Sequence, residues 1–379
     1  MNTKLSSLFI VISFLLAACT GSSSARKEKT EENGGRKIEI KYAQGFSIQH
    51  FNEYTLIVVR NPWDTTHILE KYILVYRNKK IPIHLPEGTI VKIPVQRAAT
   101  CSSIFAGEYK KLGDIGKIVA VSEPQYVDIP EIKEGLRSGR IADLGITVSL
   151  NAEKLIASKP DVLIISPFEE SMHDRFKKNG ICVVKDASYM EESPLGRTEW
   201  IKFEAAFLGK DSLANAMFSK IEKRYLDLCH RINKTKNRPT VFTEKKFGNS
   251  WYIAGGNSYM GNFMKDAGAN YLWSDLHVSG SKPFSFETVF SKAIHAQYWL
   301  IKYNNVQFDL TYKQLGEEYE LYKNFNAFKN KTIFAVNSGN TPFYEVGPLE
   351  PDMILADLVS IFHPEILPNY KAKYYLKLK

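Results

Sequence analysis

The sequence NAEKLIASKPDVLII, residues 151–165, is matched further along the chain by SFETVFSKAIHAQYWLI, residues 285–301. Each stretch begins with a residue that commonly caps helices, Asn151 or Ser285, and carries a glutamate two positions later, Glu153 or Glu287. A short amphipathic segment follows, and then an apolar run of strand length. This repeated helix–strand unit predicts two similar α/β lobes, whose matching glutamates could contact a second, roughly twofold protein.

The amino terminus has the features of an export signal. Lys4 precedes the apolar run Leu8–Leu16, which is too short to span a bilayer, and Leu16-Ala17-Ala18-Cys19 follows. An ordinary secretory signal would also end in small residues, but a cysteine directly after Leu-Ala-Ala favours a lipobox. We expect residues 1–18 to be a lipoprotein signal peptide, Cys19 to be lipidated, and residues 19–37 to form a flexible polar tether. The protein would then be anchored to a bacterial membrane and face the periplasm.

Composition excludes several functional classes. The chain has 379 residues and a formal net charge of +9, with 44% hydrophobic and 24% charged residues, which is typical of a globular protein. The basic residues are scattered and the chain is expected to be exported, so we expect no nucleic-acid partner. Beyond Cys19, three cysteines remain, an odd number, and no Cys-x-x-Cys motif suggests redox or zinc chemistry. We expect a monomer in which Cys182 and Cys229 are packing residues, and the pairing of Cys101, Cys182 and Cys229 stays open.

The pattern of elements predicts three parts after the tether. Residues 38–190 form an amino-terminal α/β lobe with a β-rich entry segment, 38–95, whose role stays open, and residues 235–379 form a second lobe. Strands alternating with helices indicate parallel sheets covered by helices. Between the lobes, residues 191–234 carry apolar side chains at helical spacing from Trp200 to Leu228. They predict a long interlobe helix, or a pair of helices broken at Gly209, that limits lobe closure to small angles.

Several short stretches follow one another in a characteristic order and spacing. They are Arg97-Ala98-Ala99-Thr100, Ile141-Ala142-Asp143-Leu144-Gly145, Asn151-Ala152-Glu153, Gly196-Arg197, Ser285-Phe286-Glu287, and Pro351-Asp352 through His363-Pro364-Glu365. With these stretches, residues 90–370 resemble a known family, the class III substrate-binding proteins of bacterial ATP-driven importers. The second repeat departs from the family pattern, since Ala296-Gln297 stands where Pro-Asp is usual.

The resemblance implies a fold of two Rossmann-like lobes with mainly parallel sheets joined by a long interlobe helix. It implies an ABC-importer component that captures an iron complex, a ferric siderophore or haem, between the lobes and delivers it to a permease dimer with its ATPase. A corrinoid is the alternative ligand, and a scavenging or sensing lipoprotein without an importer is a further alternative. By position, Glu153 and Glu287 resemble the glutamates that engage permease arginines, although acidic residues also stabilise helix starts by themselves.

A metal chelate or tetrapyrrole would lie between the lobes, at loops that leave the strand ends. Aromatic side chains there would offer rigid apolar walls with polar edges. His277 could bind a metal and tyrosines could bind haem iron, but no metal-spaced histidine pair is present, so we expect neither a metal site nor a resident cofactor. The candidate ligand residues are Arg97, Thr100, Ser102, Ser103, Phe168 and Glu169 in the first lobe, and Trp251, Tyr252, Tyr259, Trp273, His277, Tyr303, Phe343 and Tyr344 in the second.

Enzymatic activity is disfavoured. The chain lacks Gly-x-Ser-x-Gly and His-Glu-x-x-His, and the glycine spacing at residues 256–261 is followed by Asn262 instead of a phosphate-loop lysine. Binding of bare zinc or manganese ions is disfavoured too, because no histidine-rich tract is present.

Overall fold

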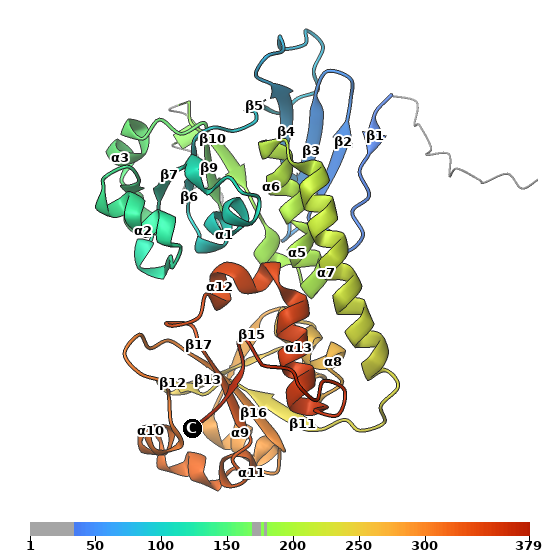
Figure 1. Cartoon of the computed structure of the whole chain (residues 1–379), viewed down its shortest axis with the longest axis vertical. Coiled ribbons are helices and arrows are strands. Elements are labelled where there is room, and N and C mark those ends of the chain that lie inside the picture. Colours follow the sequence, from blue (N-terminus) through green and yellow to red (C-terminus); the bar gives the residue numbers. More distant parts are fainter. Residues whose placement is uncertain (1–33, 169–175, 178–179) are drawn as a thin grey trace, which may run out of the picture.

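The computed structural model describes residues 34–168, 176–177 and 180–379. Cys19 and Glu169 therefore lie outside the described residues. Two α/β lobes stand one above the other, with helices running between them, and an additional sheet lies beside the upper lobe (Figure 1). None of the described helices is both long and apolar enough to cross a membrane.

The upper, amino-terminal lobe is built on a five-stranded parallel sheet. Its strands run in the order β10-β9-β6-β7-β8, and every neighbouring pair is parallel. The strands are buried, as expected for a parallel sheet with helices on its faces. The elements are β6 Ala98–Thr100, α1 Ser103–Lys111, β7 Ile118–Val121, α2 Pro130–Arg137, β8 Ala142–Asp143, α3 Ala152–Ala157, β9 Val162–Ile165 and β10 Cys182–Lys185.

The lower, carboxy-terminal lobe has the sheet order β14-β11-β16-β17-β18, in which only β18 is antiparallel. A smaller antiparallel sheet, β12-β13-β15, stands beside it. The elements are β11 Thr240–Thr243, β12 Lys246–Phe247, β13 Ser250–Ala254, α8 Tyr259–Asp266, β14 Asn270–Tyr271, β15 Ser281–Phe284, α9 Phe286–Ala293, β16 Tyr298–Tyr303, α10 Tyr312–Glu318, α11 Asn326–Lys329, β17 Ile333–Asn337 and β18 Leu376–Lys377.

The internal repeat predicted from sequence is present in the topology. Four strands of each lobe follow one order, β10-β9-β6-β7 above and β17-β16-β11-β14 below. In the upper lobe β9, which follows the helix that carries Glu153, lies between β6 and β10. In the lower lobe β16, which follows the helix that carries Glu287, lies in the same way between β11 and β17. Asn151 caps α3 by accepting a hydrogen bond from the Lys154 amide at 2.9 Å, and Ser285 caps α9 by accepting one from the Thr288 amide at 3.3 Å. The predicted two-lobed fold is confirmed.

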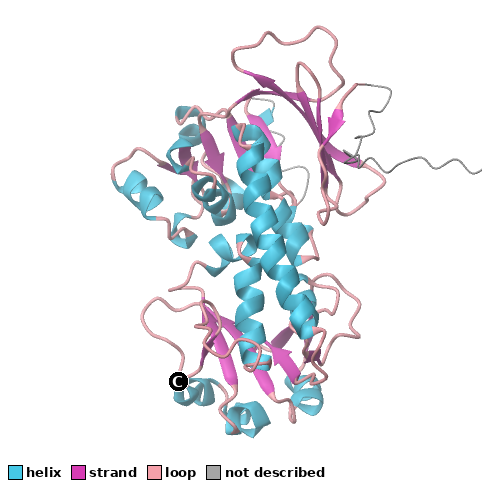
Figure 2. Cartoon of the chain, turned by 45° about the vertical axis from the view of Figure 1, so that its right-hand side comes forward, coloured by secondary structure: helices cyan, strands magenta, loops and turns pink. Residues whose placement is uncertain are grey.

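The connection between the lobes is a broken helix. It consists of α5 Pro194–Glu199, α6 Ile201–Leu208 and α7 Asp211–Ile232. Gly209, with φ +67°, ends α6, because the left-handed conformation suits glycine. Helix α13, Pro351–Phe362, lies beside α7 in both views (Figures 1 and 2), where Arg224 Nε is 2.5 Å from Asp352 Oδ2. Two adjacent helices therefore support the lobe junction.

Residues 36–93 form a sheet of their own instead of joining the lobe sheet. Its order is β1-β2-β3-β4-β5, antiparallel except for the last pair. The sheet packs against the upper lobe, where the Tyr72 hydroxyl donates to the Val183 carbonyl at 3.2 Å and accepts from the Lys185 amide at 2.7 Å, and it also faces the interlobe helices (Figure 2). Phe46 packs on Trp200 with ring centroids 4.7 Å apart, and the carboxylate of Glu199 accepts the amides of Lys41, Tyr42 and Ala43. The strands are β1 Arg36–Lys37, β2 Phe46–His50, β3 Thr55–Arg60, β4 Ile68–Tyr76 and β5 Thr89–Ile93.

Candidate functional site

Two adjoining cavities open between and below the lobes. The interlobe cavity, of about 1040 Å³, has walls from both lobes. The C-lobe cavity, of about 1110 Å³, is lined almost entirely by the lower lobe. They share a wall made of Lys302–Asn304 and of Phe343 and Tyr344 in the short helix α12, Phe343–Val346. We call the two cavities together the cleft.

The topology explains the position of the cleft. Cys101–Ser103 follow β6 and Ser166–Phe168 follow β9, while Glu244 follows β11 and Asn304 follows β16. The sheet order reverses direction between the neighbouring strands β6 and β9 in the upper lobe, and between β11 and β16 in the lower lobe. Loops at the carboxyl ends of such strands diverge and leave a crevice. The same crevice occurs in both lobes, so the two crevices meet across the junction.

A small polar network lies on the upper wall of the interlobe cavity. Thr147 Oγ1 donates to Glu123 Oε2 at 2.9 Å and lies 2.8 Å from Ser122 Oγ. Glu123 has φ +49°, which is uncommon for a residue with a side chain. Such strain persists only where the surroundings enforce it, and it is concentrated at functional sites.

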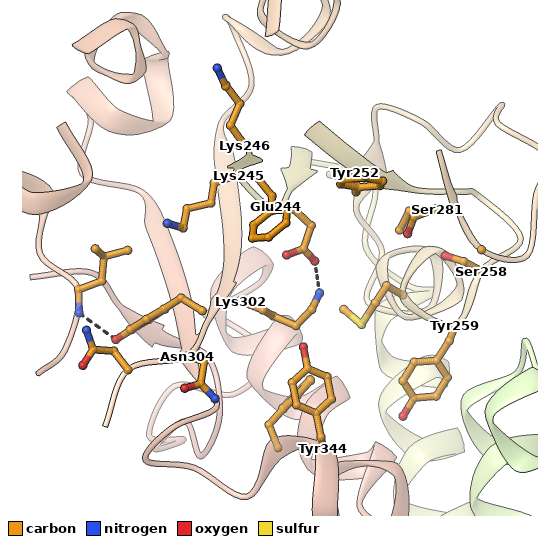
Figure 3. Close-up of a pocket in the computed structure, with 18 of the residues that line it drawn as sticks. Glu244, Lys245, Lys246, Tyr252, Ser258, Tyr259, Ser281, Lys302, Asn304 and Tyr344 are labelled. Carbon is orange, nitrogen blue, oxygen red and sulfur yellow. Dashed lines mark hydrogen bonds and ion pairs between the residues drawn. The ribbon is translucent and has the colours of Figure 1, made fainter. Parts of the chain in front are cut away.

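The C-lobe cavity contains a second strained glutamate. Glu244 has φ +65°, and its backbone is held from both sides: its amide donates to the Leu300 carbonyl at 2.7 Å, and its carbonyl accepts from Trp299 Nε1 at 2.6 Å. This conformation brings the Glu244 carboxylate onto the ammonium group of Lys302, and Tyr344 points its hydroxyl toward them (Figure 3). Burial alone would lower the pKa of Lys302, but the Glu244 carboxylate raises it overall. Lys302 is therefore a paired cation in the cavity wall.

Arg197 and Tyr259 form the end of the C-lobe cavity nearest the connector. The Arg197 guanidinium lies 3.9 Å from the centroid of the Tyr259 ring and donates to the carbonyl of Tyr189 at 2.5 Å. Among the described residues, neither Arg197 Nε nor the buried Tyr259 hydroxyl has a hydrogen-bond partner. Burial raises the pKa of Tyr259 to about 12, so its hydroxyl stays protonated. Both atoms are sealed from solvent, so the pair closes this end of the cavity.

Exposed apolar and aromatic side chains concentrate on the walls of the cleft. Large exposed apolar surfaces on a folded protein mark binding sites, and aromatic walls suit a flat or bulky ligand. These side chains are Tyr126, Val148, Phe168 and Val306 in the interlobe cavity, Phe247, Tyr252 and Phe308 in the C-lobe cavity, and Tyr344 in both.

The structure brings eight of the sequence-predicted ligand residues to the cleft. Those of the first lobe come from the loops after β6 and β9, and those of the second from β13, α8, the end of β16 and α12. Ser102, Ser103 and Phe168 line the interlobe cavity, Tyr252 and Tyr259 line the C-lobe cavity, and Tyr303, Phe343 and Tyr344 line both.

Two first-lobe predictions are wrong in position. Arg97 precedes β6, so it lies at the amino end of the strand, and the cleft is at the carboxyl end. Its guanidinium instead donates to the carbonyls of Ser158 and Lys159, at 2.6 and 2.9 Å, and so fastens the turn before β9. Thr100 is buried within the sheet and lines neither cavity.

Three second-lobe predictions are also wrong in position. Trp251 points into the core, where it packs against Trp299 with ring centroids 5.7 Å apart, while its neighbour Tyr252 on β13 faces the cavity. This alternation is the ordinary consequence of the strand period of two. Trp273 is buried beneath Lys292, whose ammonium lies 5.2 Å from its ring centroid. His277 is exposed in a loop and lines neither cavity.

Sequence reasoning missed several polar residues of the cleft. Glu244 and Lys246 follow β11, Lys302 ends in the cavity from β16, and Glu123 follows β7. Glu345 was missed as well: burial raises its pKa to about 7. The signal that could have found most of them is their place just beyond a predicted parallel strand.

A two-lobed fold with a large open cleft at the strand ends defines a solute-binding protein. The family model for periplasmic binding proteins matches residues 107–338. The chain belongs to this family, whose members are non-enzymatic components of ABC importers that bind small ligands and deliver them to permeases.

Similar proteins agree with this assignment. An uncharacterized lipoprotein of Methanocaldococcus jannaschii is 28% identical over 367 residues, which cover 89% of this chain and 85% of that protein. A periplasmic haem-binding protein of Pseudomonas aeruginosa superposes with a TM-score of 0.56 at 19% identity, over 75% of this chain and 96% of that one. MolA of Haemophilus influenzae, bound to molybdate, gives a TM-score of 0.57 at 17% identity, over 73% and 89% of the two chains. These solved structures share the fold.

Proposed function

We propose that this protein captures an iron complex, a ferric siderophore or haem, in the cleft and delivers it to an ABC permease dimer. The observation that carries the proposal is the concentration of exposed aromatic and apolar side chains on two adjoining cavities of about 1110 and 1040 Å³. Ligand cavities for drug-sized molecules span about 300–1000 Å³. A cleft of this size and surface suits a bulky, largely apolar ligand better than a bare ion.

Two lysines of the C-lobe cavity are already paired. Lys302 and Lys245 are neutralised by Glu244 and Glu318, respectively. The Lys246 ammonium lies on the Trp251 side of the β12–β13 hairpin, 4.4 Å from the centroid of the Tyr319 ring, which lines neither cavity. We therefore expect the cargo to contact mainly the aromatic and apolar walls of this cavity.

Absorption and mass spectra of material copurified with the protein test the ligand class. A Soret band or a siderophore charge-transfer band would support the proposal, and a corrinoid spectrum would replace the iron complex with cobalamin as cargo. Titration of the stripped protein with haemin and with ferric hydroxamate and catecholate complexes should show at least one saturable interaction.

A pair of variants ties that binding to the cleft. Tyr344→Ala removes an aromatic side chain shared by both cavities and should weaken binding about 10-fold or more, because such a contact contributes about 1.5–3 kcal/mol. Trp63→Ala removes an exposed aromatic outside the cleft and should leave affinity unchanged. Equal effects of the two substitutions would contradict binding in the cleft.

Delivery would use the two glutamates of the repeat. Glu153 and Glu287 are exposed at the second position of capped helices, α3 in the upper lobe and α9 in the lower. For Glu287, its own backbone amide and the Ser285 hydroxyl lower the pKa, so the carboxylate is charged at neutral pH. Two such charges, one on each lobe, fit two arginines on a symmetric permease dimer.

Charge reversal tests this docking. The double variant Glu153→Arg with Glu287→Arg should bind cargo normally and lose stimulation of the importer ATPase. A matched control, Glu134→Arg with Glu320→Arg, changes two exposed glutamates of the same lobes that pair only with basic residues three positions on. Normal uptake by the first double variant would remove the docking role of the two glutamates.

We also propose that Cys19 is lipidated and anchors the protein to the membrane. The lipobox supports this assignment, and the similar archaeal protein is itself described as a lipoprotein. Intact mass of the membrane fraction should show diacylglyceryl addition in the native chain and none in Cys19→Ser.

A further inference from the structure

Three carboxylates meet inside the upper lobe, away from the cleft. Glu108 comes from α1, Asp186 directly follows β10, and Glu204 comes from α6. The residues are 1%, 0% and 0% exposed, respectively. One oxygen of each lies within 4.8 Å of an oxygen of the other two. We call these residues the buried carboxylate triad.

The triad lacks the hydrogen bonds that buried carboxylates require. Both oxygens of Glu204, Oε2 of Glu108 and Oδ2 of Asp186 are buried without a hydrogen-bond partner among the described residues. Asp186 Oδ1 accepts a hydrogen bond from the Ser188 amide at 2.7 Å. An unpaired buried carboxylate is costly, so each such group needs an explanation.

Two other buried carboxylates of the protein are fully satisfied. Glu199 accepts three backbone amides and the ammonium of Lys202. Asp357 accepts the amides of Lys373, Tyr374 and Tyr375 and the hydroxyl of Tyr370. Outside the triad, Asp352 Oδ1 is the one buried carboxylate oxygen without a partner among the described residues, and its second oxygen pairs with Arg224.

We propose that the buried carboxylate triad is a structural binding site for one hard divalent cation, of which Ca²⁺ fits best. All donors are carboxylate oxygens, which suit Ca²⁺, Mg²⁺ or Mn²⁺ and not the softer metals. Mg²⁺ usually keeps several of its waters, for which a site sealed from solvent offers no supply, so Ca²⁺ is the expected ion. One oxygen of each residue lies within 4.8 Å of an oxygen of the other two, so ligands from three separate elements converge on one point.

The electrostatics of the triad agree with a missing cation. Burial raises the pKa of Glu108 and of Glu204 well above the ordinary value, and it raises that of Asp186 to about 7. The positive charge of Arg197 lowers the pKa of Asp186, and the negative charge of Glu191 raises it. A divalent ion would allow all three carboxylates to ionise and would satisfy their free oxygens.

The ion would fasten α1 to the interlobe helices. Helix α1 also meets α12 at Gly107, where a Cβ atom would lie 2.3 Å from the backbone oxygen of Glu345. Since Glu345 lines the interlobe cavity, the ion would hold in place the α1 surface that supports the cleft. The triad is sealed from solvent, so the ion would be taken up while the chain folds.

Refolding tests the site. The full mature chain is denatured in EDTA, refolded with Ca²⁺, Mg²⁺ or Mn²⁺ or with EDTA, desalted, and its metal content is measured by inductively coupled plasma mass spectrometry. We expect one Ca²⁺ ion per chain and a melting temperature several degrees above that of the EDTA-refolded protein. An ion-free chain whose melting temperature is the same in all four conditions would overturn the proposal. It would indicate that the triad carboxyl groups are protonated in the folded protein.

Two variants make the result specific. Glu204→Gln should abolish calcium retention, and in EDTA it should melt at or above the wild-type temperature, because it removes a buried charge. Asp266→Asn changes a carboxylate outside the triad, which accepts the Tyr225 hydroxyl, and should retain one ion. Calcium retained by Glu204→Gln as by wild type would overturn the site. If Glu204→Gln does not fold even with calcium, Asp186→Asn serves in its place, and the wild-type refolding series decides independently of any variant.

Discussion

The ion pair between Glu244 and Lys302 can be tested by removing its positive partner. Lys302→Met keeps the length of the side chain and deletes the ammonium group. The Lys302 side chain is 16% exposed and that of Glu244 is 23% exposed, so the remaining carboxylate stays largely out of water. It also cannot turn away freely, because the backbone of Glu244 is held at φ +65° by hydrogen bonds to Leu300 and Trp299.

Removing one partner of a fully buried pair costs about 3–5 kcal/mol. Partial exposure screens the charge of Glu244 and lowers the cost, so we expect a loss of about 2 kcal/mol in the free energy of unfolding. Urea denaturation of wild type, Lys302→Met, Glu244→Gln and the double variant measures it. The double variant should recover part of the loss, with a coupling energy of about 1–2 kcal/mol.

The same cycle separates two roles of Lys302. If Lys302→Met unfolds within about 0.5 kcal/mol of wild type and the substitutions are additive, Lys302 is not held by Glu244 and the reasoning is refuted. A loss of ligand affinity without a loss of stability would then identify Lys302 as a direct partner of the ligand. We expect the opposite order of effects, a loss of stability without a loss of ligand affinity.

Three further predictions concern the cleft, the lobe junction and the additional sheet. Burial raises the pKa of Glu345 from 4.5 to about 7, so the stability that its protonated form contributes below pH 4.5 is lost as the pH rises through 7. Over that window the free energy of unfolding of wild type should fall by up to about 3 kcal/mol relative to Glu345→Gln. Urea denaturation that shows the same pH dependence for the two proteins would contradict this. Gly107→Ala should cost about 1–3 kcal/mol by overpacking against Glu345, while the exposed Gly116→Ala, with no atom within 4 Å, should be neutral or stabilising; thermal melts compare them. Phe46→Ala should cost about 3–5 kcal/mol, because its ring packs on Trp200 and Phe203, and an unchanged melting temperature would show that the sheet of residues 36–93 is not part of the connector core.

Much of the fold followed from local patterns. The strands Val162–Ile165, Ile118–Val121 and Thr240–Thr243 lie where the apolar runs predict them, because a buried parallel strand is a continuous apolar segment. The caps Asn151 and Ser285 were predictable too, since capping depends on neighbouring backbone groups alone.

The ligand residues were predicted less well, for a reason that one strand illustrates. Trp251 and Tyr252 are adjacent aromatics near a glycine-rich turn, and the sequence offers no local reason to separate them. In the structure Trp251 enters the core beside Trp299, and Tyr252 lines the cavity. Which face of a strand is buried depends on what packs against it.

The sequence by itself determined the duplicated lobes, the helix caps, the paired glutamates and the break at Gly209, because periodicity, capping and backbone preference act over a few neighbouring residues. Only the tertiary structure decided that residues 36–93 cover the connector, that Arg97 lies at the wrong end of its strand for the cleft, and that Glu108, Asp186 and Glu204 converge in the core. These features join segments far apart in the chain. Their positions follow from how the sheets and helices pack, which no local pattern records.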